Sequence, residues 1–298
     1  MSMKSVSFSF HLLLLLLLVM HGDGSGTEEM ADDLISKGTS VLRLHSMDHD
    51  RQTEDDGTTV QSRVDPLSHM DHMDLSVMVF FTLKDLKVGN SMPIYFRKKD
   101  SSKSPRFLPR QEADSIAFSL KELPNLLRLF SFSRDSPQAK AMEATLRECE
   151  SQAIKGETKF CATSLESMLE FASSIFGSNT SFKTLATEHL TKSSTLFQNY
   201  TVLTTPEEIP APMMVACHTV PYPYAVLYCH SQVTENRVFK VSLDGENGDK
   251  VTAVAVCHKD TTQWNRNHVS FRVLGIEPGT PGVCHFFPAD NFVLVPDP

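Results

Sequence analysis

The order of apolar and polar positions divides the chain into three stretches. Residues 6–20 form an apolar run that contains seven consecutive leucines. Residues 25–78 are polar and contain no Trp, Tyr or Phe. From Val79 onward, short apolar runs and helical patterns alternate to the end of the chain. We therefore expect one folded domain over residues 79–298, preceded by two segments of different character.

The first segment has the form of a secretory signal peptide. Lys4 precedes the apolar run, and Gly22, Gly24 and Gly26 follow it. The run is shorter than the roughly 20 residues that span a bilayer, and no later segment is apolar enough to do so. We therefore expect a signal peptide over residues 1–24 and no integral membrane span after its cleavage.

The second segment, residues 25–78, carries twelve acidic and four basic side chains, a balance of −8 that equals that of the whole chain. Such a composition predicts a disordered acidic arm. Its histidines (His45, His49, His69 and His72) suggest either a loose metal-binding tract or a solvated tail, and we favour the tail. The remaining domain is neutral, which argues against a nucleic-acid partner.

Two helices are predicted in the first half of the domain. Ser136 and Pro137 are typical of a helix start, and the helix should extend to about Glu150. Thr163 and Glu166 have the spacing of a capping box for a second helix that ends near Gly177. A disulfide between Cys149 and Cys161 would join the facing ends of these helices.

Strands are predicted on both sides of the helices. Residues 77–81 form a strand-like apolar run, and residues 237–243 and 251–256 resemble a hairpin around a turn-rich connector. Residues 269–274 and 292–295 should add two more strands. The expected fold is α+β: an N-terminal helical portion followed by a mostly antiparallel β-sheet, stapled by disulfides, after the signal peptide and the disordered acidic arm.

Candidate chemistry is concentrated in four Cys-His dipeptides. Because adjacent residues on a strand point to opposite faces, each dipeptide would place its cysteine and its histidine on different sides of a sheet. They are Cys217-His218, Cys229-His230, Cys257-His258 and Cys284-His285.

The first two dipeptides fall on the predicted arms of a hairpin, residues 215–220 and 226–230. A five-residue loop would place Cys217 opposite Cys229 and both histidines on the other face, whereas a four-residue loop would move His218 to the face of Cys229. We favour the five-residue loop.

Three interpretations of these dipeptides remain open. In a secreted chain the even set of six cysteines should form disulfides, in a connectivity that sequence does not fix. The histidines would then be either hydrogen-bonded core groups or ligands of a metal, for which copper(II) suits four imidazoles best. Mixed Cys2His2 zinc sites rank last, because they need reduced thiols. The cysteines are Cys149, Cys161, Cys217, Cys229, Cys257 and Cys284.

The spacing of the four dipeptides resembles the signature of the plant BURP-domain family. Further stretches match over residues 79–298: Phe80-Phe81, Asp85-Leu86, 107–110 and 156–168, with 221–226 and 284–288 most like the unknown-seed-protein-like (USP-like) subgroup. One departure is residues 117–120, where many members read Pro-Phe-Ser followed by a small or polar residue. The resemblance also adds His268, in the segment after Trp264, as a weaker fifth metal ligand.

Sequons at Asn179 and Asn199 fit a glycoprotein of the secretory pathway. The resemblance implies delivery to the apoplast and cell wall or to the protein storage vacuole. Relatives suggest a non-catalytic role in seed or reproductive development or in stress responses, with wall polysaccharide, a wall enzyme or a vacuolar matrix protein as partner.

The alternative that the family offers is a copper-dependent oxidative peptide cyclase, for which catalytic residues are unknown. Because the arm lacks Trp and Tyr, such an enzyme would act on a separate peptide. No other catalytic motif is present. We expect Trp264 to be an ordinary core residue and His189 to lie on a surface or helix.

Overall fold

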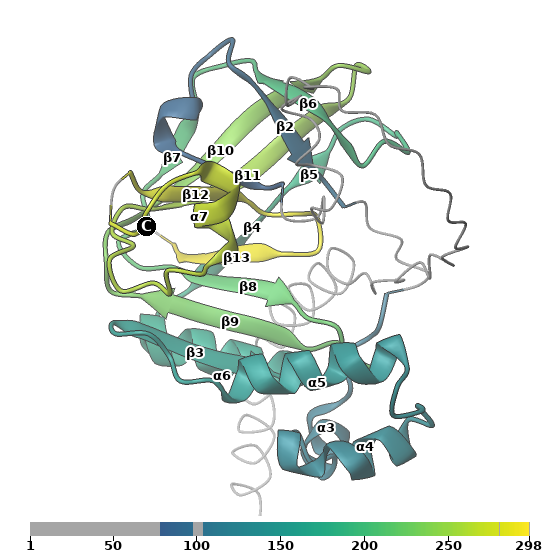
Figure 1. Cartoon of the computed structure of the whole chain (residues 1–298). Helices are drawn as coiled ribbons and strands as arrows, with labels where there is room; N and C mark the ends of the chain where they lie inside the picture. The colour runs from purple at the N-terminus through teal and green to yellow at the C-terminus, as the bar shows by residue number, and fades with distance from the viewer. Residues whose placement is uncertain (1–77, 98–103, 280, 298) are drawn as a thin grey trace, which may run out of the picture. The chain divides into compact units, whose positions relative to one another are not determined.

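The computed structural model describes residues 78–97, 104–279 and 281–297 of the chain (Figure 1). The predicted signal peptide and nearly all of the predicted acidic arm lie outside these residues. In the described part, no helix is both long and apolar enough to cross a membrane.

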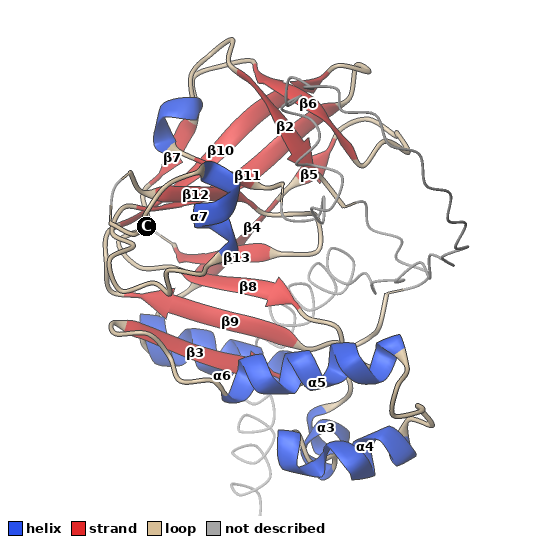
Figure 2. Cartoon of the chain, in the orientation of Figure 1, coloured by secondary structure: helices blue, strands red, loops and turns tan. Residues whose placement is uncertain are grey.

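Two antiparallel sheets form the frame of the domain (Figure 2). The eight-stranded sheet A has the order β1-β12-β11-β10-β6-β2, with two short strands, β5 and β7, paired to β11 and β10. Its strands are β1 (Phe80–Phe81), β2 (Ser91–Tyr95), β5 (Glu188–His189), β6 (Phe197–Val202), β7 (Glu207–Ile209), β10 (Asn236–Gly245), β11 (Lys250–His258) and β12 (Val283–Phe286).

The five-stranded sheet B has the order β3-β9-β8-β13-β4. An apolar cluster joins the two sheets: Val254 and Val256 of sheet A pack with Leu185, Ala216 and Val293 of sheet B. The strands of sheet B are β3 (Glu157–Ala162), β4 (Phe182–Ala186), β8 (Val215–Thr219), β9 (Leu227–Gln232) and β13 (Phe292–Pro296).

Helices lie between strands β2 and β4 along the chain rather than in a separate N-terminal portion, because β1 and β2 precede them and belong to sheet A. The helices there are α3 (Arg110–Ser115), α4 (Leu123–Leu129), α5 (Pro137–Glu150) and α6 (Leu165–Phe176), with 3-10 turns at Leu83–Asp85 and Leu120–Glu122. The predicted helix at 137–150 is confirmed, and the Oγ of Ser136 accepts a hydrogen bond from the Ala139 amide at 3.1 Å.

Two of the local predictions are wrong: the residues that cap the second helix, and the strand at 269–274. The second helix is capped by Ser164 with Ser167, not by Thr163 with Glu166, because the Ser164 and Ser167 hydroxyls bond each other's backbone amides. Residues 269–274, predicted as a strand, form helix α7 (Val269–Leu274). His268 caps this helix and Gly275 ends it in the left-handed conformation, so local end signals outweigh the β-branched composition.

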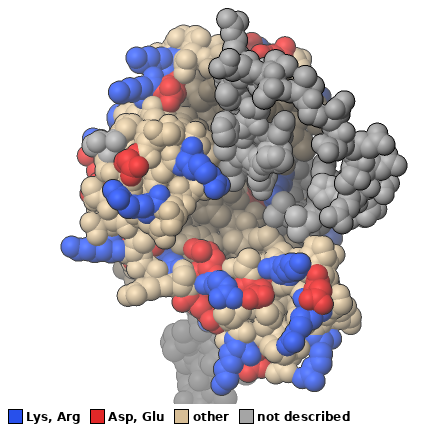
Figure 3. Space-filling model, in the orientation of Figure 1, with Lys and Arg blue, Asp and Glu red and all other residues tan. Residues whose placement is uncertain are grey.

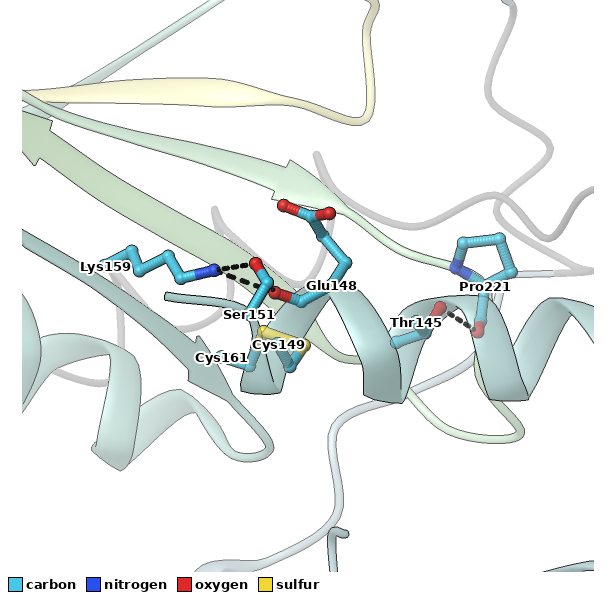
Figure 4. The surroundings of a disulfide bond; sticks show 7 residues. All are labelled: Thr145, Glu148, Cys149, Ser151, Lys159, Cys161 and Pro221. Carbon is cyan, nitrogen blue, oxygen red and sulfur yellow. Dashed lines mark hydrogen bonds between the residues drawn. A yellow bond between two sulfur atoms is a disulfide. The ribbon is translucent and has the colours of Figure 1, made fainter. Parts of the chain in front are cut away.

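The described cysteines form three disulfides: Cys149–Cys161, Cys217–Cys229 and Cys257–Cys284. The first joins the end of α5 to strand β3 rather than to a second helix (Figure 4). On the same helix, the buried Thr145 hydroxyl donates a 2.7 Å hydrogen bond to the Pro221 carbonyl. Helix α5 is thereby attached to strand β3 by the disulfide and to the loop between β8 and β9 by the hydrogen bond.

Candidate functional site: a histidine cluster between two disulfide-linked hairpins

The first two Cys-His dipeptides lie on β8 and β9. Cys217 is directly opposite Cys229, and the two form a disulfide with Cα atoms 4.1 Å apart. The amide of Val220 donates to the carbonyl of Val226, so the loop has the five residues that we favoured. His218 and His230 lie on the other face, with their Nε2 atoms 3.4 Å apart.

The last two dipeptides repeat this arrangement on β11 and β12. Cys257 is directly opposite Cys284, again with a disulfide, and the Cα atoms are 3.9 Å apart. The rings of His258 and His285 stack with centroids 5.5 Å apart. Because every cysteine of the hairpins is in a disulfide, the Cys2His2 zinc interpretation is wrong.

The two histidine pairs, one from each sheet, meet in a single cavity of about 740 Å³. The rings of His218 and His285 are 5.8 Å apart between centroids, and both stack on Phe287. Trp264 borders the cavity too, so it is not the ordinary core residue that we expected. Its ring makes edge contacts with the rings of both His258 and His268.

Burial favours the neutral form of three of the four clustered imidazoles, those of His218, His258 and His285. It lowers the pKa of His218 and of His258 far below the usual value, with a further contribution from neighbouring histidines. It lowers the pKa of His285 to about 3. A neutral imidazole keeps one nitrogen lone pair available for a metal or a hydrogen bond.

The donor set suits a transition metal, although the rings are not gathered around one point. Among the described residues, no three or more His, Cys, Asp or Glu side chains are grouped closely enough to hold a metal ion. Four imidazoles facing one cavity are nevertheless a ligand set that suits copper(II). Ligation by all four would require the rings to rotate toward one another.

Each of three cluster histidines has a polar partner that the sequence did not predict. Glu157 Oε1 lies 3.1 Å from His230 Nδ1, Asn236 Oδ1 lies 2.8 Å from His258 Nδ1, and Asn291 Nδ2 lies 3.2 Å from His218 Nδ1. Burial alone would raise the pKa of Glu157, but its interactions with His230, the Ile154 amide and Lys159 together lower it below its usual value. These contacts depend on strand register, for which the sequence carries no local signal.

The rim of the cavity is built by the end of α5 and by β3. Lys159 donates to the Glu148 carbonyl at 2.8 Å and to Ser151 Oγ at 2.6 Å (Figure 4). Its Nζ also lies over the Tyr228 ring, 5.4 Å from the centroid. Burial raises the pKa of Tyr228. Lys, Arg, Asp and Glu side chains are interspersed on the face of the molecule in Figure 3.

Of the other predicted site residues, His268 lines the same cavity beside Trp264, whereas the two sequon asparagines do not. His268 Nδ1 accepts a hydrogen bond from the Ser270 amide, so this nitrogen caps α7. His189 is half-buried on strand β5 and packs edge-on against Phe96, so its predicted place on a surface or helix is wrong. Asn179 is exposed after α6, whereas Asn199 lies on β6 and donates to Glu246 at 2.8 Å.

Comparison with known proteins places this arrangement in a family. The family model described as "BURP domain" matches residues 79–296. The chain is 47% identical to "BURP domain-containing protein BNM2A" of Brassica napus over 227 residues, which cover 74% of this chain and 80% of that protein. It is 45% identical to "BURP domain protein USPL1" of Arabidopsis thaliana, covering 74% of this chain and 81% of that protein.

A more distant relative is "BURP domain protein RD22" of Arabidopsis thaliana, 39% identical over 74% of this chain and 56% of that protein. The family model covers most of the chain, and the two nearer relatives match over most of their own lengths. The chain belongs to the BURP-domain family.

Proposed function

We propose that this protein binds copper through His218, His230, His258 and His285. The observation that carries the proposal is the meeting of four Cys-His histidines, two from each sheet, in one cavity. Three of these side chains are neutral because burial lowers their pKa. Copper bound here would supply one-electron oxidation chemistry.

The surrounding disulfides and side chains position the proposed ligands. The disulfides fix the two pairs of opposed strands, so the spacing of the histidines on each hairpin is set by covalent bonds. Asn236 holds the Nδ1 side of His258 and leaves its Nε2 for the metal, and the Glu157 carboxylate lies 3.1 Å from the Nδ1 of His230. Phe287 packs under His218 and His285 and limits the access of water from that side.

We assign this copper-binding protein a non-catalytic role in the cell-wall or vacuolar matrix, in seed or reproductive development or in stress responses. Membership of the family, the three disulfides and the exposed sequon at Asn179 support a secreted glycoprotein. A wall polysaccharide, a wall enzyme or a vacuolar matrix protein is the expected partner.

A second candidate is a copper-dependent oxidative cyclase that acts on a separate peptide. The observation that favours it is the size of the cavity, about 740 Å³, which is within the range of small-molecule and cofactor sites and reaches all four histidines. Tyr228, Lys159 and Trp264 at its walls offer aromatic and charged contacts for a peptide side chain.

The test is elemental analysis of the mature protein, secreted from plant cells, beside a variant with all four histidines changed to Ala. We expect near-stoichiometric copper in the wild type and none in a variant that remains folded by circular dichroism. Absence of bound metal in the wild type after copper loading and desalting would contradict the proposal. If copper is bound, oxygen consumption with a peptide that contains Tyr or Trp would support the cyclase. Absence of oxygen consumption would support the matrix role.

A further inference from the structure

The cluster histidines differ in which ring nitrogen carries the hydrogen. A neutral imidazole has one N–H and one lone pair, and a metal binds only at the lone pair. The partner of the remote nitrogen therefore decides whether the nitrogen that faces the cluster is free to bind. At His218 and at His258, that partner is an asparagine whose orientation is fixed by its other hydrogen bonds.

At His258 the asparagine presents an acceptor. Asn236 Nδ2 donates to the carbonyls of Thr234 at 2.8 Å and Gln232 at 3.3 Å, so its Oδ1 is the atom 2.8 Å from His258 Nδ1. His258 must carry its hydrogen on Nδ1, which leaves the lone pair on Nε2. At His230 the group nearest to Nδ1 is the carboxylate of Glu157, with Oε1 3.1 Å away, but the contact does not have the geometry of a hydrogen bond and does not fix the position of the hydrogen.

At His218 the asparagine presents a donor instead. The amide of Thr219 donates to Asn291 Oδ1 at 2.9 Å, and the Thr219 hydroxyl lies 3.2 Å from the same atom. Asn291 Nδ2 therefore donates to His218 Nδ1 at 3.2 Å. The hydrogen of His218 is on Nε2, where it points to the Nε2 of His230, 3.4 Å away.

We propose that Asn291 is a positioning residue that keeps His218 from binding the metal in the resting cluster and thereby sets the copper affinity. His258 is prepared as an Nε2 ligand, whereas His218 must move its hydrogen to Nδ1 and break its bond with Asn291. The inference rests on the proposed copper function. By the same reasoning His268 is not a metal ligand in this state. Its Nδ1 lone pair accepts from the Ser270 amide, so its hydrogen is on Nε2.

Long-range ¹H–¹⁵N correlation spectra of the metal-free, ¹⁵N-labelled mature protein test the hydrogen placement. We expect hydrogen on Nε2 in His218 and on Nδ1 in His258. In Asn291→Asp, a carboxylate oxygen replaces the amide donor, so His218 should switch to hydrogen on Nδ1. Asn291→Ala removes the donor without adding charge and should leave His218 without a fixed preference.

Copper affinity, measured by competition with a chelator, tests the consequence. Asn291→Asp should lower the dissociation constant by about tenfold or more, the scale of effects of partners behind metal ligands. Asn291→Ala should lower it by less. The control Asn265→Asp adds the same charge at the cavity wall without touching His218. It should leave the hydrogen of His218 on Nε2, and it should lower the dissociation constant by much less than Asn291→Asp does.

Hydrogen on Nδ1 of His218 in the wild type would overturn the inference, as would a switch in Asn291→Asp without tighter copper binding. An equal gain in affinity from Asn265→Asp would overturn it as well, because charge alone would then be sufficient. If none of the proteins binds copper, the proposed function fails and the affinity role with it. The spectra still decide the hydrogen placement separately.

Discussion

The β8–β9 and β11–β12 hairpins have the same chemistry and are built by different means. Both place a disulfide between opposed cysteines and a histidine after each cysteine on the cavity face. The first is closed by a loop of five residues, whereas the second connects through a long segment that includes Trp264, His268 and α7. Local sequence is sufficient to set the first register, while the second needs contacts from the rest of the domain.

The polar partners of the two hairpins also differ. The second hairpin has Asn236 as an acceptor behind His258, and the first has a donor, Asn291, behind His218. Asn236 is on the neighbouring strand β10 of the same sheet, and Asn291 directly precedes strand β13. The pairs are thus not equivalent as ligands, although their dipeptides are identical.

The largest expected effect comes from removing the disulfides one at a time. Cys257→Ser/Cys284→Ser opens a link with a sequence separation of 27, and Cys217→Ser/Cys229→Ser opens one of 12. Each should lower the free energy of unfolding by about 2–5 kcal/mol, and the loop-entropy relation makes the longer link worth about 0.7 kcal/mol more.

Chemical denaturation of the two double variants gives this comparison directly. Cys149→Ser/Cys161→Ser, which removes the disulfide at α5, serves as a reference with the same separation of 12. A larger loss from the β8–β9 link than from the β11–β12 link would contradict the view that the short loop already holds the first hairpin.

This contrast marks how far sequence could predict the site. Ser136 and Pro137 predicted the start of helix α5 correctly, because capping is a local property. The spacing of the first two dipeptides around the proline-rich loop predicted that Cys217 lies opposite Cys229. Local patterns failed for residues 269–274, where caps at both ends override strand propensity. They could not reveal Glu157 or Asn291, because those contacts depend on which distant strands become neighbours.

A second, smaller effect should appear as acid sensitivity of the metal-free protein. The pKa of His285 is about 3 in the folded state, against an ordinary value of 6.5. Below about pH 6.5 the unfolded chain takes up a proton that the folded chain refuses, so the free energy of unfolding falls as pH falls. The loss is about 1.4 kcal/mol per pH unit until the folded pKa is approached.

Denaturation in the presence of a chelator at several pH values between 7.5 and 5 measures this slope. His285→Gln on the second hairpin and His218→Gln on the first should each reduce it, because burial lowers the pKa of both histidines. An unchanged slope in both variants would mean that these side chains are not held neutral by burial.

The smallest effect concerns the helix that supports only the first hairpin. Thr145→Val removes the hydroxyl that donates to the Pro221 carbonyl at the start of the five-residue loop (Figure 4). We expect a loss of about 1 kcal/mol in the free energy of unfolding, and rescue by Thr145→Ser, which keeps the hydroxyl. Equal stability of the Val and Ser variants would show that this contact does not hold the loop.

The most direct test of the central claim is the copper stoichiometry of two pair variants, one for each hairpin. If the hairpins form a single shared site, the wild type should bind one copper per chain. His218→Ala/His230→Ala and His258→Ala/His285→Ala should each lose it while their disulfides stay intact. Two coppers in the wild type and one in each variant would contradict the account, because each hairpin would then hold its own metal.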